Sequence, residues 1–125
     1  MFRSTILAVG LFASSGAPEA SWTMFAECGR VGQERLYSYD EASMQRHGED
    51  VGVQLKADYS RVPGSRAATA RIHWVVNCRH RSFVEKSRLE YASNGRLVAQ
   101  YRATRSMGIN PDSVADKLFQ KICAE

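Results

Sequence analysis

Histidine and cysteine are the residue types that most often bind transition metals in proteins, and both are sparse in this chain. The histidines are His47, His73 and His80. His73 and His80 could approach each other across the basic turn at 79–81, but a zinc-type site also needs a second closely spaced pair of ligands. The chain supplies no such pair, so the sequence predicts no metal site and no cofactor.

Nucleophilic and acid–base catalysis are also hard to place. Cys28 could act as a nucleophile, but no base is evident beside it in the sequence. Glu85 and Glu90 fall on one predicted strand and do not make a convincing acid–base pair. The chain has no glycine-rich phosphate loop and no serine in a nucleophile-elbow pattern. We therefore expect a protein that is not an enzyme, and an enzyme of undefined type is the least favoured hypothesis.

Arginine offers the clearest chemistry, which is the binding of anions. Arginines on or beside three successive predicted strands are Arg71, Arg79, Arg81, Arg88, Arg96 and Arg102. If the outer faces of these strands align, they form a basic stripe suited to a glycan, a lipopolysaccharide or an acidic protein segment. The candidate binding residues on this basic face are Arg71, His73, Arg79, Arg81 and Arg88. The alternative is a solvated face whose charge is balanced by Glu85 and Glu90.

Two tyrosines in a Tyr-x-Tyr pattern are candidates for recognition aromatics. Tyr37 and Tyr39 share one face of a predicted strand, with Leu36 and Ser38 on the other. An exposed tyrosine gives a partner both an apolar ring and a hydroxyl group. The alternative is that both rings pack in the core or at its edge.

The elements that must position these residues are mainly strands. The strongest strand signal is 68–78, where every second residue is apolar from Ala68 to Cys78, while Arg71 and His73 fall on the other face. Other strands are predicted at 21–27, 33–40, 50–59, 79–91 and 96–104, with a possible bulge near Val84. Residues 40–48 read as a turn with a short helical segment, 60–66 as a loop, and Asn94-Gly95 as a hairpin turn.

The C-terminal segment has a helical pattern instead. Asn110 is the expected N-cap, followed by Pro111 and Asp112 in the first turn. Apolar residues recur at helical spacing and place Cys123 at the edge of the apolar stripe. Because Cys78 ends the apolar face of the central strand, the simplest fold joins Cys78 to Cys123 and leaves Cys28 unpaired. Such a bridge closes a loop of roughly 45 residues and stabilises a small domain by about 4 kcal/mol.

Length, composition and charge fit one small exported domain. The chain has 125 residues, 44% of them hydrophobic and 24% charged, which is ordinary for a globular domain and excludes a disordered one. The net charge of +4 is a small surplus, so we predict no nucleic-acid partner. Residues 1–20 resemble a signal peptide, with Arg3, a short apolar run at 6–13 and small residues next, so cleavage is expected between about 15 and 20. Residues 21–125 then form the domain, with no transmembrane segment.

Several of these residues, taken in order, resemble the surface-adhesin protein E family of Gram-negative bacteria. The matching features are Trp22, a segment with Tyr37, Tyr39, Asp40, Ser43, Arg46 and Gly48, a strand ending in Cys78, Arg79 and Arg81, then Tyr91, Gly95 and a helix closing on Cys123. The resemblance covers about 100 residues and rests on order and spacing rather than on one motif. It implies an α+β fold, a single antiparallel sheet of about six strands with a C-terminal α-helix packed across one face and tethered by a disulfide.

The resemblance also implies export to the periplasm or to the cell surface. The best-known family member is lipid-anchored, whereas Cys28 follows Phe25, Ala26 and Glu27, which are unlike the residues before a lipidated cysteine. Both a soluble periplasmic and a surface-displayed protein therefore remain open. The leading hypothesis is a binding module for a host matrix protein or an anionic glycan. The alternative is a periplasmic accessory protein that forms a homodimer through an edge strand or through Cys28.

Overall fold

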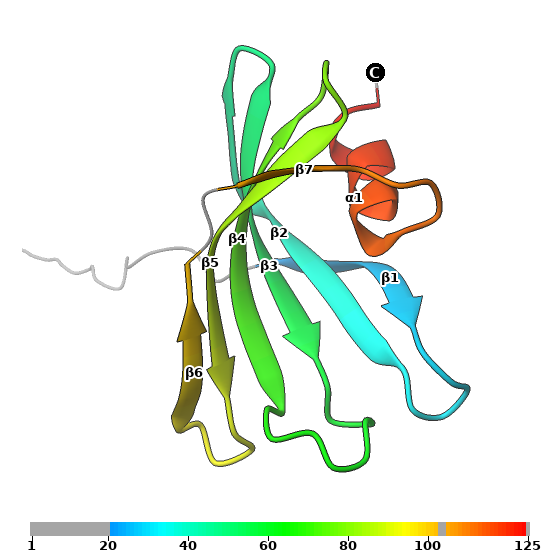
Figure 1. The fold of residues 1–125 in the computed structure, drawn as a ribbon, viewed down its shortest axis with the longest axis vertical. Helices are drawn as coiled ribbons and strands as arrows, with labels where there is room; N and C mark the ends of the chain where they lie inside the picture. Colours follow the sequence, from blue (N-terminus) through cyan, green and yellow to red (C-terminus); the bar gives the residue numbers. More distant parts are fainter. Residues whose placement is uncertain (1–20, 103–104, 125) are drawn as a thin grey trace, which may run out of the picture.

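The computed structural model describes residues 21–102 and 105–124, which form one antiparallel sheet and one helix (Figure 1). The elements are β1 (Trp22–Cys28), β2 (Arg35–His47), β3 (Asp50–Asp58), β4 (Thr69–Asn77), β5 (Ser82–Tyr91), β6 (Leu97–Tyr101), β7 (Ser106–Gly108) and α1 (Val114–Ile122). The predicted signal peptide at 1–20 and the last residues of the predicted strand 96–104 lie outside the described residues.

The sheet is open and follows the order of the chain. Strands β1 to β6 pair with their sequence neighbours, all antiparallel, and the short β7 pairs with the first part of β5. The single antiparallel sheet of about six strands is therefore confirmed. Strand β7 was not predicted, because Ser106, Met107 and Gly108 are all exposed and show no apolar alternation.

Strands β3 and β4 carry the centre of the core. On β3, alternate residues are at most 1% exposed: Val51, Val53, Leu55 and Ala57. Their cross-strand partners on β4 are Val76, Trp74, Ile72 and Ala70. We call the side of the sheet that bears these residues the core face and the opposite side the outer face. The strict period-two pattern of both strands fixes which side is buried, as the sequence predicted.

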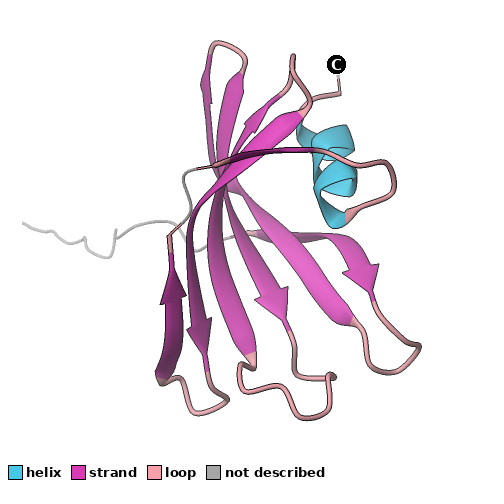
Figure 2. Ribbon diagram, viewed as in Figure 1, coloured by secondary structure: helices cyan, strands magenta, loops and turns pink. Residues whose placement is uncertain are grey.

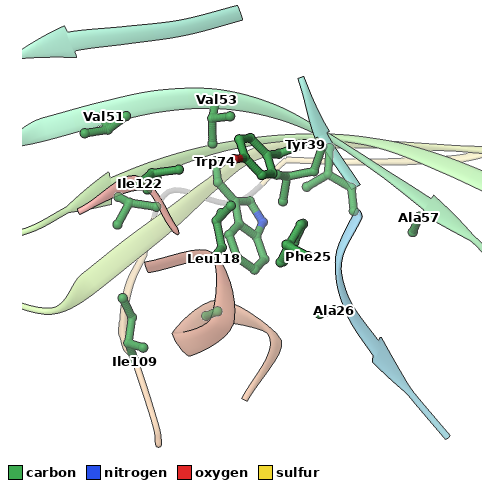
Figure 3. Packing of buried hydrophobic residues seen from close by; sticks show 14 of the residues in the cluster. Phe25, Ala26, Tyr39, Val51, Val53, Ala57, Trp74, Ile109, Leu118 and Ile122 are labelled. Carbon is green, nitrogen blue, oxygen red and sulfur yellow. The ribbon is translucent and has the colours of Figure 1, made fainter. Parts of the chain in front are cut away.

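Helix α1 lies beside β1 and near one end of the sheet (Figure 2). Its Leu118 and Ile122 are 0% and 2% exposed and belong to the same buried cluster as Val53 and Trp74 (Figure 3). A disulfide joins Cys78, just after β4, to Cys123 at the helix C-cap, with their Cα atoms 5.5 Å apart. The predicted C-terminal helix and its disulfide to the sheet are confirmed.

The helix begins three residues later than predicted. Ser113, not Asn110, is the N-cap, and its Oγ accepts a hydrogen bond of 3.1 Å from the backbone N–H of Asp116. Asp112 has a φ of 62°, which is incompatible with a first helical turn there. Asn110 to Asp112 instead form a turn that leads into the helix, so the start signals were assigned to the wrong polar residue.

Strand β2 is longer than predicted, and residues 40–48 are not a turn. The strand continues to His47, and its register against β3 shifts between Asp40 and Gln45. The Ser43 Oγ donates to the carbonyl of Asp40 at 2.7 Å and accepts from the N–H of Gln54 at 3.0 Å. These bonds hold the extra residues as a bulge within the sheet. The chain reverses only at 48–49, between the paired ends of β2 and β3.

Strand β5 contains the bulge that the sequence suggested, two residues further along. His73 pairs with Ser87 and Trp74 with Glu85, so Lys86 has no partner on β4, whereas Val84 pairs regularly. A single extra residue exchanges the two faces of everything after it. Arg88 therefore lies opposite the core residue Ile72. This inversion decides where the candidate binding residues lie.

Candidate anion-binding pocket

The structure separates the residues predicted to form one basic face. Arg71 and His73 alternate with the buried Ile72 on β4, so both lie on the outer face. Arg88 pairs with Ile72 across strands and lies on the core face. The prediction of one continuous stripe is therefore wrong for Arg88, because the bulge at Lys86 turns this arginine to the other side of the sheet.

The other two arginines of that set lie at the turn between β4 and β5 and are ion-paired. The Arg79 Nη1 is 3.3 Å from Glu49 Oε2, and the Arg81 Nη2 is 3.2 Å from Asp116 Oδ1. The Arg81 guanidinium also lies 4.5 Å from the centre of the Phe119 ring. Arg81 thus holds α1 to the sheet, and the charge of both residues is balanced locally.

The two candidate recognition tyrosines have different environments. Tyr39 is 7% exposed and packs edge-on against Phe25, with 5.9 Å between the ring centres. It is a core residue. Tyr37 is half-buried at the edge of the core, 6.3 Å from Phe25, and it lines a pocket. Only Tyr37 remains a candidate for recognition.

That pocket brings together Tyr37 and Arg88, which the sequence placed in separate groups. It has a volume of about 400 Å³. Its walls come from β2, the β3–β4 loop and β5, and consist of Arg35, Tyr37, Tyr59, Val62, Ser65, Arg66, Ala67, Arg88 and Glu90. These strand ends and loops lie at the bottom of the sheet in Figure 2, whereas α1 lies beside its upper half. We call this site the arginine pocket.

Arg88 is fixed on the floor of the arginine pocket by a network that reaches into the core. It donates from Nε and Nη2 to Glu85, at 3.1 and 2.9 Å, and from Nη1 to the Tyr59 hydroxyl at 2.8 Å. Glu85 also accepts a bond of 3.0 Å from Trp74 Nε1. Glu85 and Arg88 meet because the bulge between them puts residues three apart on one face. Arg88 is therefore both rigid and largely neutralised.

Burial and hydrogen bonding set the charge states around this network. Burial opposes the charge of Arg88, but its hydrogen bonds and charge interactions with Glu85 and Tyr59 together outweigh that effect and raise the pKa of Arg88. The pKa of Glu85 is lowered, since the bonds from Arg88 and Trp74 outweigh the effect of burial. Burial raises the pKa of Tyr37 and of Tyr59. The floor of the pocket is thus a compensated ion pair flanked by neutral phenols.

The free positive charge of the pocket comes from Arg35 and Arg66. Both are exposed. Arg35 donates from Nη1 to Cys28 Sγ at 3.6 Å, and a hydrogen bond with Tyr37 raises the pKa of Arg35. Arg66 donates from Nη2 to the Val98 carbonyl at 3.3 Å. Within residues 21–102 and 105–124, neither arginine forms an ion pair with a carboxylate. Both guanidinium groups can therefore bind an incoming anion.

A second basic cluster lies on the outer face. Lys56 Nζ and the Arg71 guanidinium lie 5.0 and 5.2 Å from the centre of the Trp22 ring. Such distances allow cation–π attraction. Trp22 therefore stacks with cations on the outer face. Both cations already contact the Trp22 ring. The cluster therefore accounts for the position of Trp22 and is the weaker candidate for a binding site.

The match to known proteins agrees with this architecture. The family model described as surface-adhesin protein E matches residues 22–124. The chain belongs to the surface-adhesin protein E family. This confirms the resemblance drawn from the order of its aromatic, basic and cysteine residues. No curated protein matches the chain.

Solved structures of another member of the protein E family share the fold. Crystal form II of Haemophilus influenzae protein E superposes with a TM-score of 0.59 at 17% identity, covering 94% of this chain and 97% of that chain. A second structure of Haemophilus influenzae protein E gives 0.57 at 18% identity, covering 86% and 90%. At such low identity the likeness extends to the fold and not to individual binding residues.

The sequence analysis did not identify three of the residues that line the arginine pocket, namely Arg35, Arg66 and Tyr59. Arg35 could have been found, because it continues the alternation of Tyr37 and Tyr39 on β2. Arg66 and Tyr59 lie in or beside the β3–β4 loop, where no periodicity predicts which way a side chain points.

In the part of the chain that the structure describes, no cluster of three or more His, Cys, Asp or Glu residues could hold a metal ion. No helix there is long and apolar enough to cross a membrane.

Proposed function

We propose that this protein is an exported, non-enzymatic binding module that attaches to a host matrix protein or an anionic glycan through the arginine pocket. The observation that carries the proposal is the pair of exposed arginines, Arg35 and Arg66, without carboxylate partners in the described residues, beside the half-buried Tyr37. Uncompensated guanidinium groups at an open pocket attract anions and bind them through charge-assisted hydrogen bonds. Membership of a family of surface adhesins supports the same function.

Export is part of the proposal. The features of residues 1–20 favour a signal peptide, and residues 21–125 are then the exported domain. A disulfide between Cys78 and Cys123 suits an oxidising compartment. We place the mature protein in the periplasm or at the surface of the outer membrane of a Gram-negative bacterium. Fractionation of native cells distinguishes the two, and recovery in the cytoplasm would reject both.

The binding role can be tested with a charge-reversed pocket. The domain 21–125, produced in an oxidising compartment, is passed over immobilised matrix proteins, hyaluronan and heparin. We expect binding that weakens as NaCl rises from about 0.1 to about 1 M, as the Debye length falls from about 10 to about 3 Å. The double substitution Arg35→Glu and Arg66→Glu should weaken binding at least about tenfold, a loss of roughly 1.4 kcal/mol.

A matched control distinguishes the effect of the pocket substitutions from the effect of a changed net charge. Lys117 and Lys121 are exposed on α1, away from the arginine pocket. Lys117→Glu with Lys121→Glu changes the net charge by the same amount and should keep binding within about twofold. Equal losses in both double variants would show a nonspecific charge effect. Absence of binding by the unsubstituted domain to every surface would reject the proposed function.

One observation favours the alternative of an accessory protein that self-associates. The edge strand β6 carries exposed apolar residues, with Leu97 45% and Tyr101 50% exposed. Unpaired edges of this kind can add a strand from a second copy. Cys28, partly exposed on the other edge strand and outside the disulfide, is the second possible contact. Light scattering on a size-exclusion column gives the mass of the particle in solution. On a non-reducing gel, a dimer band that disappears with reductant and in Cys28→Ser would assign the contact to Cys28.

A further inference from the structure

The arginine pocket offers a partner more than positive charge, and we propose that it binds a carboxylate-bearing sugar residue, such as a uronic acid, in preference to a sulfated sugar or an acidic peptide. This inference deepens the proposed function and rests on it. It follows from the arrangement of three kinds of group around one cavity: free guanidinium groups, tyrosine rings and a carboxylate.

The free guanidinium groups define where the anion binds. Arg88 is not available, because its Nε and Nη2 already bind Glu85 and its Nη1 binds Tyr59. Within residues 21–102 and 105–124, Arg35 and Arg66 donate to a sulfur and a backbone carbonyl, and neither forms an ion pair with a carboxylate. A guanidinium group presents a planar pair of N–H donors that matches the two oxygens of a carboxylate. The anionic group of the ligand therefore lies toward Arg35 and Arg66.

The carboxylate of Glu90 restricts what else the ligand carries. Glu90 lines the same cavity, and its Oε2 is 3.9 Å from Arg88 Nη1, beyond hydrogen-bond distance. Its side chain is 21% exposed, so it can accept bonds from hydroxyl groups of a ligand. A second anionic group placed against it would be repelled. A ligand with one carboxylate and several hydroxyl groups satisfies both sides of the cavity, whereas a densely sulfated chain does not.

The tyrosines favour a ring over an extended peptide. The Tyr37 ring packs against Phe25, with 6.3 Å between the ring centres, and the Tyr59 hydroxyl accepts a hydrogen bond of 2.8 Å from Arg88. Fixed aromatic rings present flat apolar surfaces that the C–H face of a sugar can cover. The volume of about 400 Å³ lies within the range of roughly 300–1,000 Å³ found for small-ligand sites. Carboxylate, hydroxyl groups and ring thus each have a complementary group in the pocket.

The test uses small free ligands, three sugars and one short peptide, so that the signal changes report on this cavity alone. The domain 21–125, labelled with nitrogen-15, is titrated with glucuronate, glucuronate methyl ester, glucose 6-sulfate and a short glutamate-rich peptide, and backbone amide shifts are followed. We expect glucuronate to shift signals of Tyr37, Tyr59 and Glu90 and to bind at least about tenfold more tightly than the other three. Arg35→Gln with Arg66→Gln should reduce glucuronate binding about tenfold or more, and Lys117→Glu with Lys121→Glu should not.

Glu90→Gln tests the selectivity itself. Removing the negative charge should raise the affinity for a disulfated glucose, whose second anionic group Glu90 repels, relative to glucuronate by about fivefold or more. Dispersed amide signals confirm that each variant is folded. Equal binding of the sulfate ester or the methyl ester, tighter binding of the peptide, or no shift with any sugar would overturn the carboxylated-sugar inference. The proposed function would survive these results if binding to matrix surfaces still required Arg35 and Arg66, so the two can fail separately.

Discussion

Glu85 and Arg88 lie on the same face of β5 although they are three positions apart in the sequence. In a regular strand, residues three apart point to opposite faces. Lys86 is left unpaired opposite the His73–Trp74 step, and this bulge brings the Glu85 carboxylate to 2.9 Å from Arg88 Nη2. The ion pair then positions Tyr59 and forms the floor of the arginine pocket, so one inserted residue determines the architecture of the candidate site.

Removing the charge of Glu85 should destabilise the domain. Arg88 has a side chain only 23% exposed, and Glu85→Gln would leave its guanidinium without its bidentate partner. We expect a loss of about 2 kcal/mol in the free energy of unfolding, less than for a fully buried pair because both groups retain some solvent contact. Urea denaturation followed by circular dichroism measures it. Glu41→Gln, at an exposed position in the bulge of β2, serves as the control and should change stability by less than about 0.5 kcal/mol.

The bulge also marks the limit of what the sequence could predict. Period-two alternation correctly predicted β3 and β4, because the two strands pair with each other without interruption and bury one face. The same rule fails after Lys86, since one unpaired residue exchanges the faces and the imperfect alternation located the bulge only approximately, near Val84. Arg88 was therefore assigned to the outer face beside Arg71. The error lies in one position, yet it changes the membership of the candidate site.

Local signals predicted some connections and not others. Asn94-Gly95 was expected to turn the chain, and Gly95 has a φ of 88° that glycine adopts without strain. The link between Cys78 and Cys123 was predictable because both thiols fall on apolar faces. The walls of the pocket that come from the β3–β4 loop were not predictable, because loop residues are brought to the sheet by tertiary contacts and not by a repeating pattern.

The position of the helix start gives a direct contrast between two substitutions. Ser113→Ala removes the Oγ that accepts from the N–H of Asp116 and should cost about 1 kcal/mol of stability. Asn110→Ala should cost less than about 0.5 kcal/mol of stability. The N–H and the Oγ of Ser113 donate to the backbone carbonyl of Asn110, and this carbonyl remains after the substitution. Thermal unfolding of the two variants side by side measures the difference. A larger effect at Asn110 would place the cap where the sequence first suggested.

The disulfide should account for a large part of the stability. Cys78 and Cys123 are 45 residues apart in the chain, and a loop of this size predicts a contribution of about 4 kcal/mol in the chain-entropy model. We expect Cys78→Ser with Cys123→Ser to lose about that amount in urea denaturation and to become insensitive to reductant. Cys28→Ser should match the unsubstituted protein under oxidising conditions. Stability that reductant does not change in the unsubstituted protein would contradict this role.

The attachment of α1 should weaken in acid because of Asp116. Its carboxylate accepts from the backbone N–H of Asp112 at 2.9 Å and pairs with Arg81, which lowers the pKa of Asp116 below its ordinary value of 3.8. A carboxyl group whose pKa is lower in the folded than in the unfolded state stabilises the fold at any pH above its pKa in the unfolded state. This stabilisation is lost as the pH falls through the pKa that the group has in the folded state. The stability difference between the unsubstituted protein and Asp116→Asn should therefore be full near about pH 6 and shrink toward about pH 3. Asp112→Asn is the matched control, because only the backbone N–H of Asp112 takes part and asparagine tolerates its positive φ. A difference between the unsubstituted protein and Asp116→Asn that stays constant over this range of pH would show that the carboxylate charge does not hold the helix.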